Sequence, residues 1–201
     1  MKDYTNVPKI QLKDVRPADP IFWHNTEESP WHSKQVNKHS EPIPGDELGY
    51  CHVGISDYNN RYILHAHPGR ASKTLMDPEF FRNNSKFVLE VWELPGITDV
   101  ERRIVVEEFR DNAFLKDKNG NFRYKKDGSL LGRRYDWLAI ISFGKYNDPY
   151  LLHCAEITAI SYCAIDKVLW PRGTINLVTQ PNQIILSNKL KIKGIIQCPG
   201  E

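Results

Sequence analysis

Two short apolar segments joined by four polar residues constrain the fold of this chain more than any other feature. Residues 49–56 read GYCHVGIS, residues 61–66 read RYILHA, and residues 57–60 (DYNN) separate them. Apolar segments of this length on either side of an Asn-rich turn are typical of a β-hairpin. Each segment carries one histidine, so we expect His52 and His65 to lie roughly opposite each other on adjacent strands.

The spacing of apolar residues predicts further strands. Residues 15–23 indicate a turn followed by a short strand, since their two prolines exclude a helix. Residues 86–93, KFVLEVWE, alternate apolar and polar side chains as a strand does. Short segments that are mostly β are expected at 175–178, 184–186 and 190–196.

Helices are expected between these strands. Thr98 and Glu101 have the spacing of a capping box, which predicts a helix over residues 99–115. A second long helix is expected over 150–167 and a shorter one over 135–143. The apolar faces assigned to the two long helices are Val100, Ile104, Val105 and Phe109, and Ile157, Ile160, Ala164 and Val168.

Two polar stretches are expected at the surface. Residues 24–48 are rich in Pro, Ser, Asn, His and Glu and are interpreted as a long loop. Residues 116–132 contain Asn-Gly and Asp-Gly pairs, which indicate a hairpin or a surface excursion. With no internal repeat, residues 1–201 are predicted to form a single α+β domain, with strands first and last and helices between.

Charge and hydropathy exclude several classes of function. The net charge is +2 and no long Lys/Arg run is present, which argues against nucleic acid as a partner. The longest apolar runs are too short to span a bilayer, so no transmembrane segment is expected. Residues 1–8 lack the apolar region of a secretory signal, so synthesis in the cytoplasm is expected.

Of the cysteines, Cys154 has the sequence context of a nucleophile. The four cysteines, Cys51, Cys154, Cys163 and Cys198, show no CxxC or paired spacing, which favours free thiols over a disulfide framework. Cys154 follows Asn147-Asp-Pro149, a signal that starts a helix. In the first turn of a helix, the exposed N–H groups favour the thiolate and can bind an oxyanion.

A thiol with a pKa of ~8.5 also needs a base at neutral pH, and the predicted hairpin supplies two imidazoles. We predict that His52 takes the proton of Cys154 and that His65 fixes the tautomer of His52. No metal is needed for this chemistry. Taken singly, each histidine could be a structural strand residue, and Cys154 could be a small buried core residue.

Two alternatives stay open near the hairpin. His67 could replace His65 as the third member, although Pro68 indicates that the strand ends there. A zinc site of Cys51, His52, His65 and His67 is the second alternative. It is disfavoured because adjacent strand residues face opposite ways, so Cys51 and His52 should not share one metal.

Other residues are assigned supporting or structural roles. Tyr135 is expected beside Cys154, where its hydroxyl could assist the oxyanion or simply lie in the core. Asp19 is expected to hold the backbone at the start of its strand. His153 is expected at the surface and Cys163 in a structural role. Trp23, Trp31, His32 and Trp92 are candidates for an aromatic substrate wall, with core or loop packing as the alternative.

Several segments resemble a known family. HVGI at 52–55 and ILHA at 63–66 are similar to the histidine hairpin of the NlpC/P60 papain-like superfamily. Because the cysteine follows the histidines, the chain resembles the circularly permuted branch, the YiiX-like and lecithin:retinol-acyltransferase-like proteins. Four other segments, 16–22, 88–92, 132–136 and 179–187, and CAEI at 154–157 match that branch in order, with Ala18 and Ala155 departing from its usual Gly and Ser.

The resemblance implies a papain-like antiparallel sheet packed against helices and a Cys-His-His triad of Cys154, His52 and His65, without a cofactor. It also implies a substrate among peptidoglycan stem-peptide amides, lipid acyl groups or other acyl linkages. Peptidoglycan is favoured, because no membrane-facing apolar patch or anchoring helix is apparent. A type VI secretion effector or a phage lytic protein would then be the relevant kind of protein, with an immunity protein or secretion component as partner. A binding module without activity is the remaining alternative.

Overall fold

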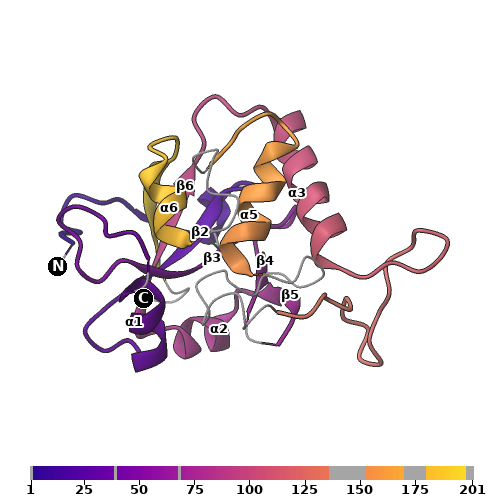
Figure 1. Ribbon diagram of the computed structural model, residues 1–201, viewed down its shortest axis with the longest axis horizontal. Helices are drawn as coiled ribbons and strands as arrows, with labels where there is room; N and C mark the ends of the chain where they lie inside the picture. The colour runs from indigo at the N-terminus through magenta and orange to yellow at the C-terminus, as the bar shows by residue number, and fades with distance from the viewer. Residues whose placement is uncertain (1, 39, 68, 136–152, 170–179, 198–201) are drawn as a thin grey trace.

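A mixed β-sheet with helices on both faces forms the frame of the molecule (Figure 1). The computed structural model describes residues 2–38, 40–67, 69–135, 153–169 and 180–197. The strands are β1 Lys9–Ile10, β2 Pro20–Asn25, β3 Tyr50–Ser56, β4 Tyr62–Ala66, β5 Ala71–Leu75, β6 Phe87–Glu93 and β7 Lys191–Ile196. The helices are α1 Trp31–Lys38, α2 Pro78–Asn83, α3 Asp99–Ala113, α5 Cys154–Cys163 and α6 Pro181–Leu186, and Leu12–Asp14 form a 3₁₀ turn.

The strand order is β1-β7-β6-β2-β3-β4-β5. Every neighbouring pair is antiparallel except β1 and β7, which run parallel. The expectation of a purely antiparallel sheet is therefore wrong at this edge. Residues 8–10 lie alongside β7, where Ile195 N–H donates to the Pro8 carbonyl and Gln197 N–H to the Ile10 carbonyl.

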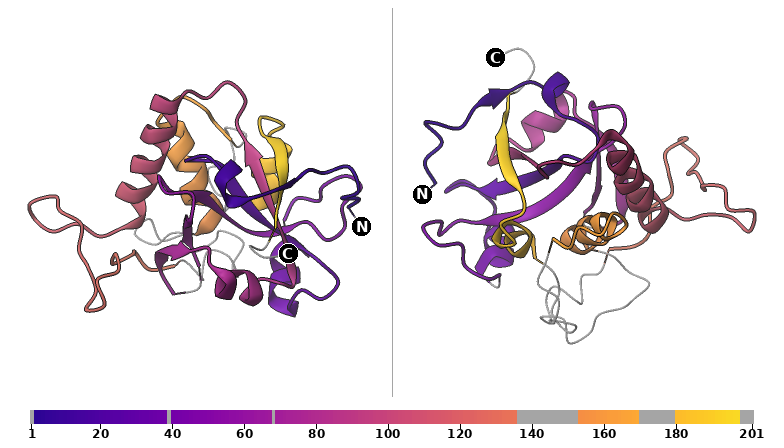
Figure 2. Two further views of the ribbon diagram at one scale, coloured as in Figure 1. Left: turned by 180° about the vertical axis from the view of Figure 1, so that it is seen from behind. Right: turned by 90° about the horizontal axis from the view of Figure 1, so that it is seen from above.

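Two apolar clusters cover the two faces of the sheet. Alternate residues of β2 face opposite ways, so Phe22 joins the cluster under α3, α5 and α6, while Ile21 and Trp23 join the cluster under α2. In Figure 2, α3 and α5 lie side by side, and α3 and α5 also share many close contacts across their interface. Among the described helices, none is both long and apolar enough to cross a membrane.

The hairpin, the strand at 86–93, the capped helix at 99–115 and the strand at 190–196 are confirmed, with ends that differ by a few residues. Thr98 and Glu101 form the predicted capping box, in which each side chain accepts from the other residue's backbone N–H. The expected segments at 135–143 and 175–178 fall on or beyond the edge of the described residues, as only Tyr135 among them is described.

Two expectations about secondary structure are wrong. Residues 184–186 belong to α6, not to a strand, because Pro181 at its first turn and the Gln180–Gln183 capping box begin a helix. Residues 24–48 are not one long loop, since β2 extends to Asn25 and α1 follows Pro30. The stretch at 116–132 does lie at the surface, with most side chains exposed.

The apolar face of α3 is also rotated from the expected one. Val100 is 68 % exposed and Ile104 is 42 % exposed, whereas Val105 and Phe109 are fully buried. The reason is Arg102, which turns inward and donates to the buried carboxylate of Asp19 over 2.6 Å. On α5, the helix ends at Cys163, so Ala164 and Val168 lie beyond it, and Ala164 is exposed.

Asp19 stabilises the start of β2, as expected. Its side chain accepts from the backbone N–H of Arg16, and it pairs with Arg102 of α3 and with Lys193 of β7. The carboxylate is fully buried, but its two cationic partners and its backbone donor supply the charge and the hydrogen bonds that burial requires. Asp19 therefore connects two strands and a helix and has a structural role.

Two matched substitutions on α3 test this burial. Val105→Ala is expected to lower the free energy of unfolding by about 2 kcal/mol, since two buried methyl groups are lost and a cavity remains. Val100→Ala is expected to change it by less than about 0.5 kcal/mol, because the side chain is exposed. Urea unfolding of both variants measures the difference, and equal losses would contradict the assigned face.

Candidate active site

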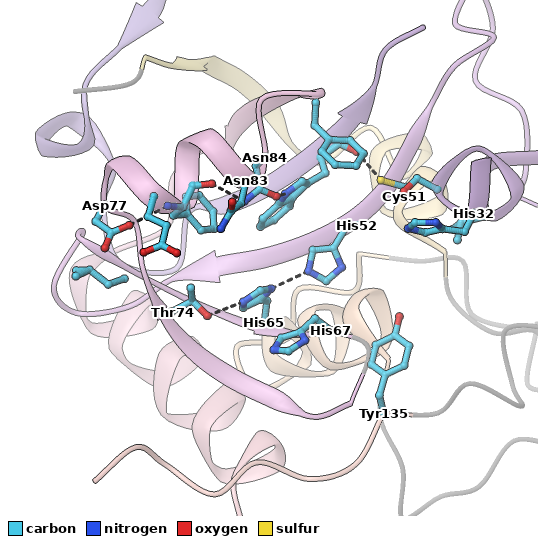
Figure 3. A pocket seen from close by; sticks show the side chains of 17 residues that line it. His32, Cys51, His52, His65, His67, Thr74, Asp77, Asn83, Asn84 and Tyr135 are labelled. Atoms are coloured by element: carbon cyan, nitrogen blue, oxygen red, sulfur yellow. Dashed lines mark hydrogen bonds between the residues drawn. The ribbon is translucent and has the colours of Figure 1, made fainter. Parts of the chain in front are cut away.

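A cavity of about 730 Å³ opens on the sheet face that carries α2, and the two hairpin histidines line it (Figure 3). Trp23 of β2 and Phe80 of α2 form apolar walls, and α1 contributes Val36. Aromatic walls with a few polar groups are typical of a site for a small molecule or for one arm of a larger substrate. The polar groups that matter most here are the imidazoles.

His52 and His65 are hydrogen-bonded to each other. His52 Nε2 lies 2.9 Å from His65 Nδ1, and His65 Nε2 lies 2.9 Å from Thr74 Oγ1. Thr74 Oγ1 in turn lies 3.0 Å from the Ser72 hydroxyl. The four side chains form a continuous chain across β3, β4 and β5, of which Figure 3 shows His52, His65 and Thr74.

This chain of hydrogen bonds decides which nitrogen of His52 can act as a base. If His65 Nε2–H donates to Thr74, then His65 Nδ1 accepts from His52 Nε2–H. His52 Nδ1 is then unprotonated and able to accept a proton. The tautomer is thus set by the direction of the Thr74 hydroxyl, a residue that we did not single out from the sequence. The alternation in residues 71–75, ASKTL, was the available signal for β5.

The expected register of the hairpin is wrong by two residues. Gly54, not His52, is opposite His65, and His52 lies diagonally on the same face. The imidazoles still meet because Gly54 has no side chain. A Cβ atom at Gly54 would lie 2.8 Å from His65 Cβ and 2.7 Å from the Leu64 carbonyl oxygen, which is too close.

Both imidazoles are shielded from solvent, since His65 is buried and His52 is half-buried. Burial lowers the pKa of His52 to about 3, with a smaller contribution from the charge of His67. Burial also lowers the pKa of His65 well below its ordinary value, with His52 and His67 as secondary causes. Trp23 contributes to this burial. Its ring stacks on that of His65, with 5.8 Å between the ring centroids, and meets the ring of His52 edge-on, with 4.6 Å between the centroids.

Cys154 is the first residue of α5, and its side chain is only 4 % exposed. Burial raises the pKa of its thiol. Hydrogen bonds from the backbone N–H of Val53, the hydroxyl of Tyr135 and the backbone N–H of Ala155 act in the opposite direction. The Tyr135 hydroxyl oxygen lies 4.0 Å from Cys154 Sγ, at the limit of a hydrogen bond to sulfur.

The thiol does not line the cavity with the histidine pair, and the two are not hydrogen-bonded in the described part of the chain. Cys154 packs in the core cluster that contains Val53, whereas Trp23, the partner of both imidazoles, belongs to the other cluster. Two groups connect them. Val53, which follows His52, donates its N–H toward the thiol, and Tyr135 both contacts the thiol and lines the cavity.

His67 lines the same cavity, with its ring 5.1 Å from that of His65. The hydrogen bond of His52 goes to His65, however, so the geometry favours His65 as the residue that orients His52. His67 acts on the pair through its charge, since it lowers the pKa of both other histidines.

Cys51 and His52 do not face opposite ways as expected, because β3 has a bulge at Cys51. Trp23 pairs with His52 and His24 pairs with Tyr50, so Cys51 is an extra residue, and both Cys51 and His52 line the cavity. Even so, the described residues contain no group of three or more His, Cys, Asp or Glu side chains placed to hold a metal ion. The zinc alternative therefore gains no support.

The remaining candidates are placed as follows. His153 is buried, not exposed, and caps α5 by accepting from the Glu156 N–H over 3.4 Å. Trp31 is exposed, and Trp92 lies away from the cavity beside Glu90. Of the four aromatic-wall candidates, Trp23 and His32 line the cavity.

Comparisons with known proteins show the fold but not the family. No family model and no curated protein sequence matches this chain. Among solved structures, the metalloprotein yiiX from Escherichia coli O157:H7, DUF1105, superposes with a TM-score of 0.56 at 16% identity. The match covers 92% of this chain and 99% of that chain. This likeness confirms the expected fold class, an α+β fold like that of yiiX, and the description as a metalloprotein applies to yiiX alone.

The buried histidines make the protein sensitive to acid, and His153 gives the clearest test. Burial lowers its pKa from 6.5 to about 3. Between these pH values the unfolded chain binds a proton that the folded protein does not, so stability falls as the pH falls, by up to ~1.4 kcal/mol per pH unit for each such histidine. His153→Asn keeps a capping acceptor and removes this titration.

We therefore expect the His153→Asn variant to lose stability less steeply between pH 6.5 and pH 3 than the wild type, as measured by urea unfolding at several pH values. His32→Asn, which removes an exposed histidine, is the matched control and should leave the slope unchanged. An identical slope in wild type and His153→Asn would show that His153 is not buried as a neutral ring.

Proposed function

We propose that this protein is a cysteine hydrolase, or an acyltransferase of the same chemistry, in which Cys154 attacks an amide or ester carbonyl. The observation that carries the proposal is the position of the thiol. Cys154 lies at the N-terminus of α5, and its thiol accepts a hydrogen bond from the backbone N–H of Val53. Val53 follows His52 in β3, and His52 is hydrogen-bonded to His65. The YiiX-like papain-like fold is compatible with a hydrolase.

In the proposed mechanism, Cys154 and His52 are both neutral at rest, since burial raises the pKa of one and lowers that of the other. Proton transfer to His52 Nδ1 therefore accompanies attack on the bound carbonyl and does not precede it. The thiol must face His52 for this step, so the mechanism requires Cys154 to leave the core cluster that it shares with Val53 and turn toward the cavity. The hydrogen bond to His65 holds the ring of His52 in the required tautomer.

The tetrahedral oxyanion is bound by the N-terminal N–H groups of α5 and by the Tyr135 hydroxyl. As it collapses, the C–N or C–O bond breaks and the leaving group takes the proton from His52. Water then attacks the thioester with His52 as base, and the thiol is released with a carboxylic acid. If an amine or alcohol replaces the water, the same site performs acyl transfer.

Two substrate classes fit this chemistry. The first is a peptidoglycan stem-peptide amide, one of the substrates that the resemblance of the sequence motifs implies, with delivery by a secretion system or phage lysis and an immunity protein as partner. The cavity favours a second candidate, an apolar acyl group, because Trp23, Val36, Leu75, Phe80 and Phe87 line it. A module that binds such a ligand without catalysis is the non-enzymatic alternative.

Substitution of two cysteines on one helix tests the nucleophile. Cys154→Ala is expected to reduce turnover at least about 10³-fold, while Cys163→Ala, at the other end of α5, should retain turnover within about twofold. The substrates are purified sacculi, scored by released peptides, and p-nitrophenyl esters of increasing acyl length. Full activity of Cys154→Ala would overturn the assignment.

The same assay separates the two substrate classes. Release of peptides from sacculi, with toxicity on export to a bacterial periplasm that Cys154→Ala abolishes, supports peptidoglycan. Intact sacculi together with ester turnover that increases with acyl length support an apolar acyl substrate. Binding of either substrate without any turnover by wild type would support the non-enzymatic alternative.

Tyr135 is predicted to help ionise the thiol. Tyr135→Phe removes a donor that lowers the pKa of Cys154, so the midpoint of its alkylation by iodoacetamide should move to higher pH. Tyr124→Phe, at an exposed position, is the control and should not move it. Peptide mass spectrometry assigns the label to Cys154, and an unchanged midpoint in Tyr135→Phe would exclude this role.

A further inference from the structure

A second polar site lies outside the cavity, centred on Glu90 of β6. This carboxylate is fully buried, yet three neighbouring side chains donate to it. They are the hydroxyls of Tyr4 and Tyr50 and the indole N–H of Trp92, the last two over 2.8 and 2.9 Å. Since no residue of this group lines the cavity, the site is distinct from the candidate active site.

The ammonium group of Lys2 occupies the centre of this group. Its Nζ donates to both oxygens of Glu90, over 2.8 and 2.9 Å, and to the Tyr50 hydroxyl over 2.6 Å. It also lies 5.2 Å from the ring centroids of Tyr50 and Trp92 and 5.5 Å from that of Tyr4. A cage of aromatic rings closed by a carboxylate is a recognition site for an ammonium ion.

Residues 2–7 are attached to the rest of the protein mainly through this cage. Asp3 and Thr5 are exposed and bond to each other, and Val7 N–H donates to the Tyr4 carbonyl within the same segment. The first backbone hydrogen bond to the sheet is made at Pro8, which accepts from Ile195 N–H. The segment can therefore leave the sheet if the side chains of Lys2 and Tyr4 leave the cage.

The cage without Lys2 would be electrostatically unfavourable. Glu90 would remain a buried carboxylate with neutral donors and no cation, and the loss of one partner from a buried ion pair is strongly destabilising. An anionic, aromatic cavity of this kind binds a cation of similar size in preference to water or a neutral group.

We propose that Tyr50, Glu90 and Trp92 form a binding site for a primary alkyl-ammonium ion, which Lys2 fills from the same chain and which a second lysyl or free alkyl-ammonium group fills when residues 2–7 lift away. Tyr50 precedes the Cys51 bulge and His52 on β3. Occupancy of the cage therefore orders the beginning of the strand that carries the candidate base.

Chemical rescue of an emptied cage tests the proposal. Lys2→Ala removes the ammonium and leaves its volume empty, so its melting temperature should fall by several degrees. Added n-butylammonium should restore most of this loss in a saturable manner and change the fluorescence of the tryptophans, whereas n-butanol, its neutral analogue, should do neither. Wild type, in which Lys2 competes for the cage, should respond to n-butylammonium only at higher concentration, and Lys2→Met, in which an uncharged side chain fills the space, should respond to neither compound.

Three results would contradict the ammonium site. An equal response of Lys2→Ala to n-butylammonium and n-butanol, or no response of Lys2→Ala to n-butylammonium, would overturn the proposal. If Lys2→Ala does not fold, circular dichroism shows whether n-butylammonium restores its structure, and failure to do so would also overturn it. None of these measurements depends on catalysis, so the result is independent of the proposed function.

A further comparison identifies the source of the ligand. A peptide of residues 2–8 added to Lys2→Ala should compete with n-butylammonium, while the same peptide with norleucine in place of Lys2 should not. Competition by the lysine peptide indicates a polypeptide ligand, and rescue by the small amine alone indicates a free amine. Rescue by the norleucine peptide would show that the ammonium group is not what the site recognises.

Discussion

The β-bulge at Cys51 is the constraint on which the functional part of the structure depends. In a regular strand, Tyr50 and His52 would face the same side of the sheet. The extra residue in β3 places Tyr50 in the core cluster under α5 and α6, while His52 faces the cavity and packs against Trp23. One local irregularity thus directs a single strand toward two polar sites, the ammonium cage and the histidine pair.

The histidine pair depends on close packing and on the exclusion of water. Gly54 leaves the space that His65 needs beside His52, and Trp23 covers both rings. The same burial makes both imidazoles weak bases, so the resting site holds neutral groups and not a thiolate–imidazolium pair. A bound substrate that displaces solvent and presents a carbonyl would supply the missing driving force for proton transfer.

Local patterns made much of this fold predictable, and non-local pairing explains what was missed. The capping box at Thr98 and the alternation in residues 86–93 act within one element, so the sequence predicts α3 and β6. The register of the hairpin differs from the expected one because its turn is centred one residue later in the chain, with Ser56 opposite Ile63. The bulge at Cys51 depends on pairing with β2, and the inward turn of Arg102 depends on Asp19, so neither has a signature in its own segment. His52, His65 and Cys154 could be named from motifs, whereas their relative positions depend on how α5 packs on β3.

Cys154 is proposed to form a covalent acyl intermediate, and trapping that intermediate tests this role. The protein is mixed with a p-nitrophenyl ester, quenched in acid within the first turnover and digested for peptide mass spectrometry. The proposed mechanism predicts a thioester of the acyl group on Cys154 and none on Cys51 or Cys163, with fragmentation of the peptide separating Cys154 from Cys163. An acyl group found only on another residue, or turnover of the ester without any thioester on Cys154, would contradict it.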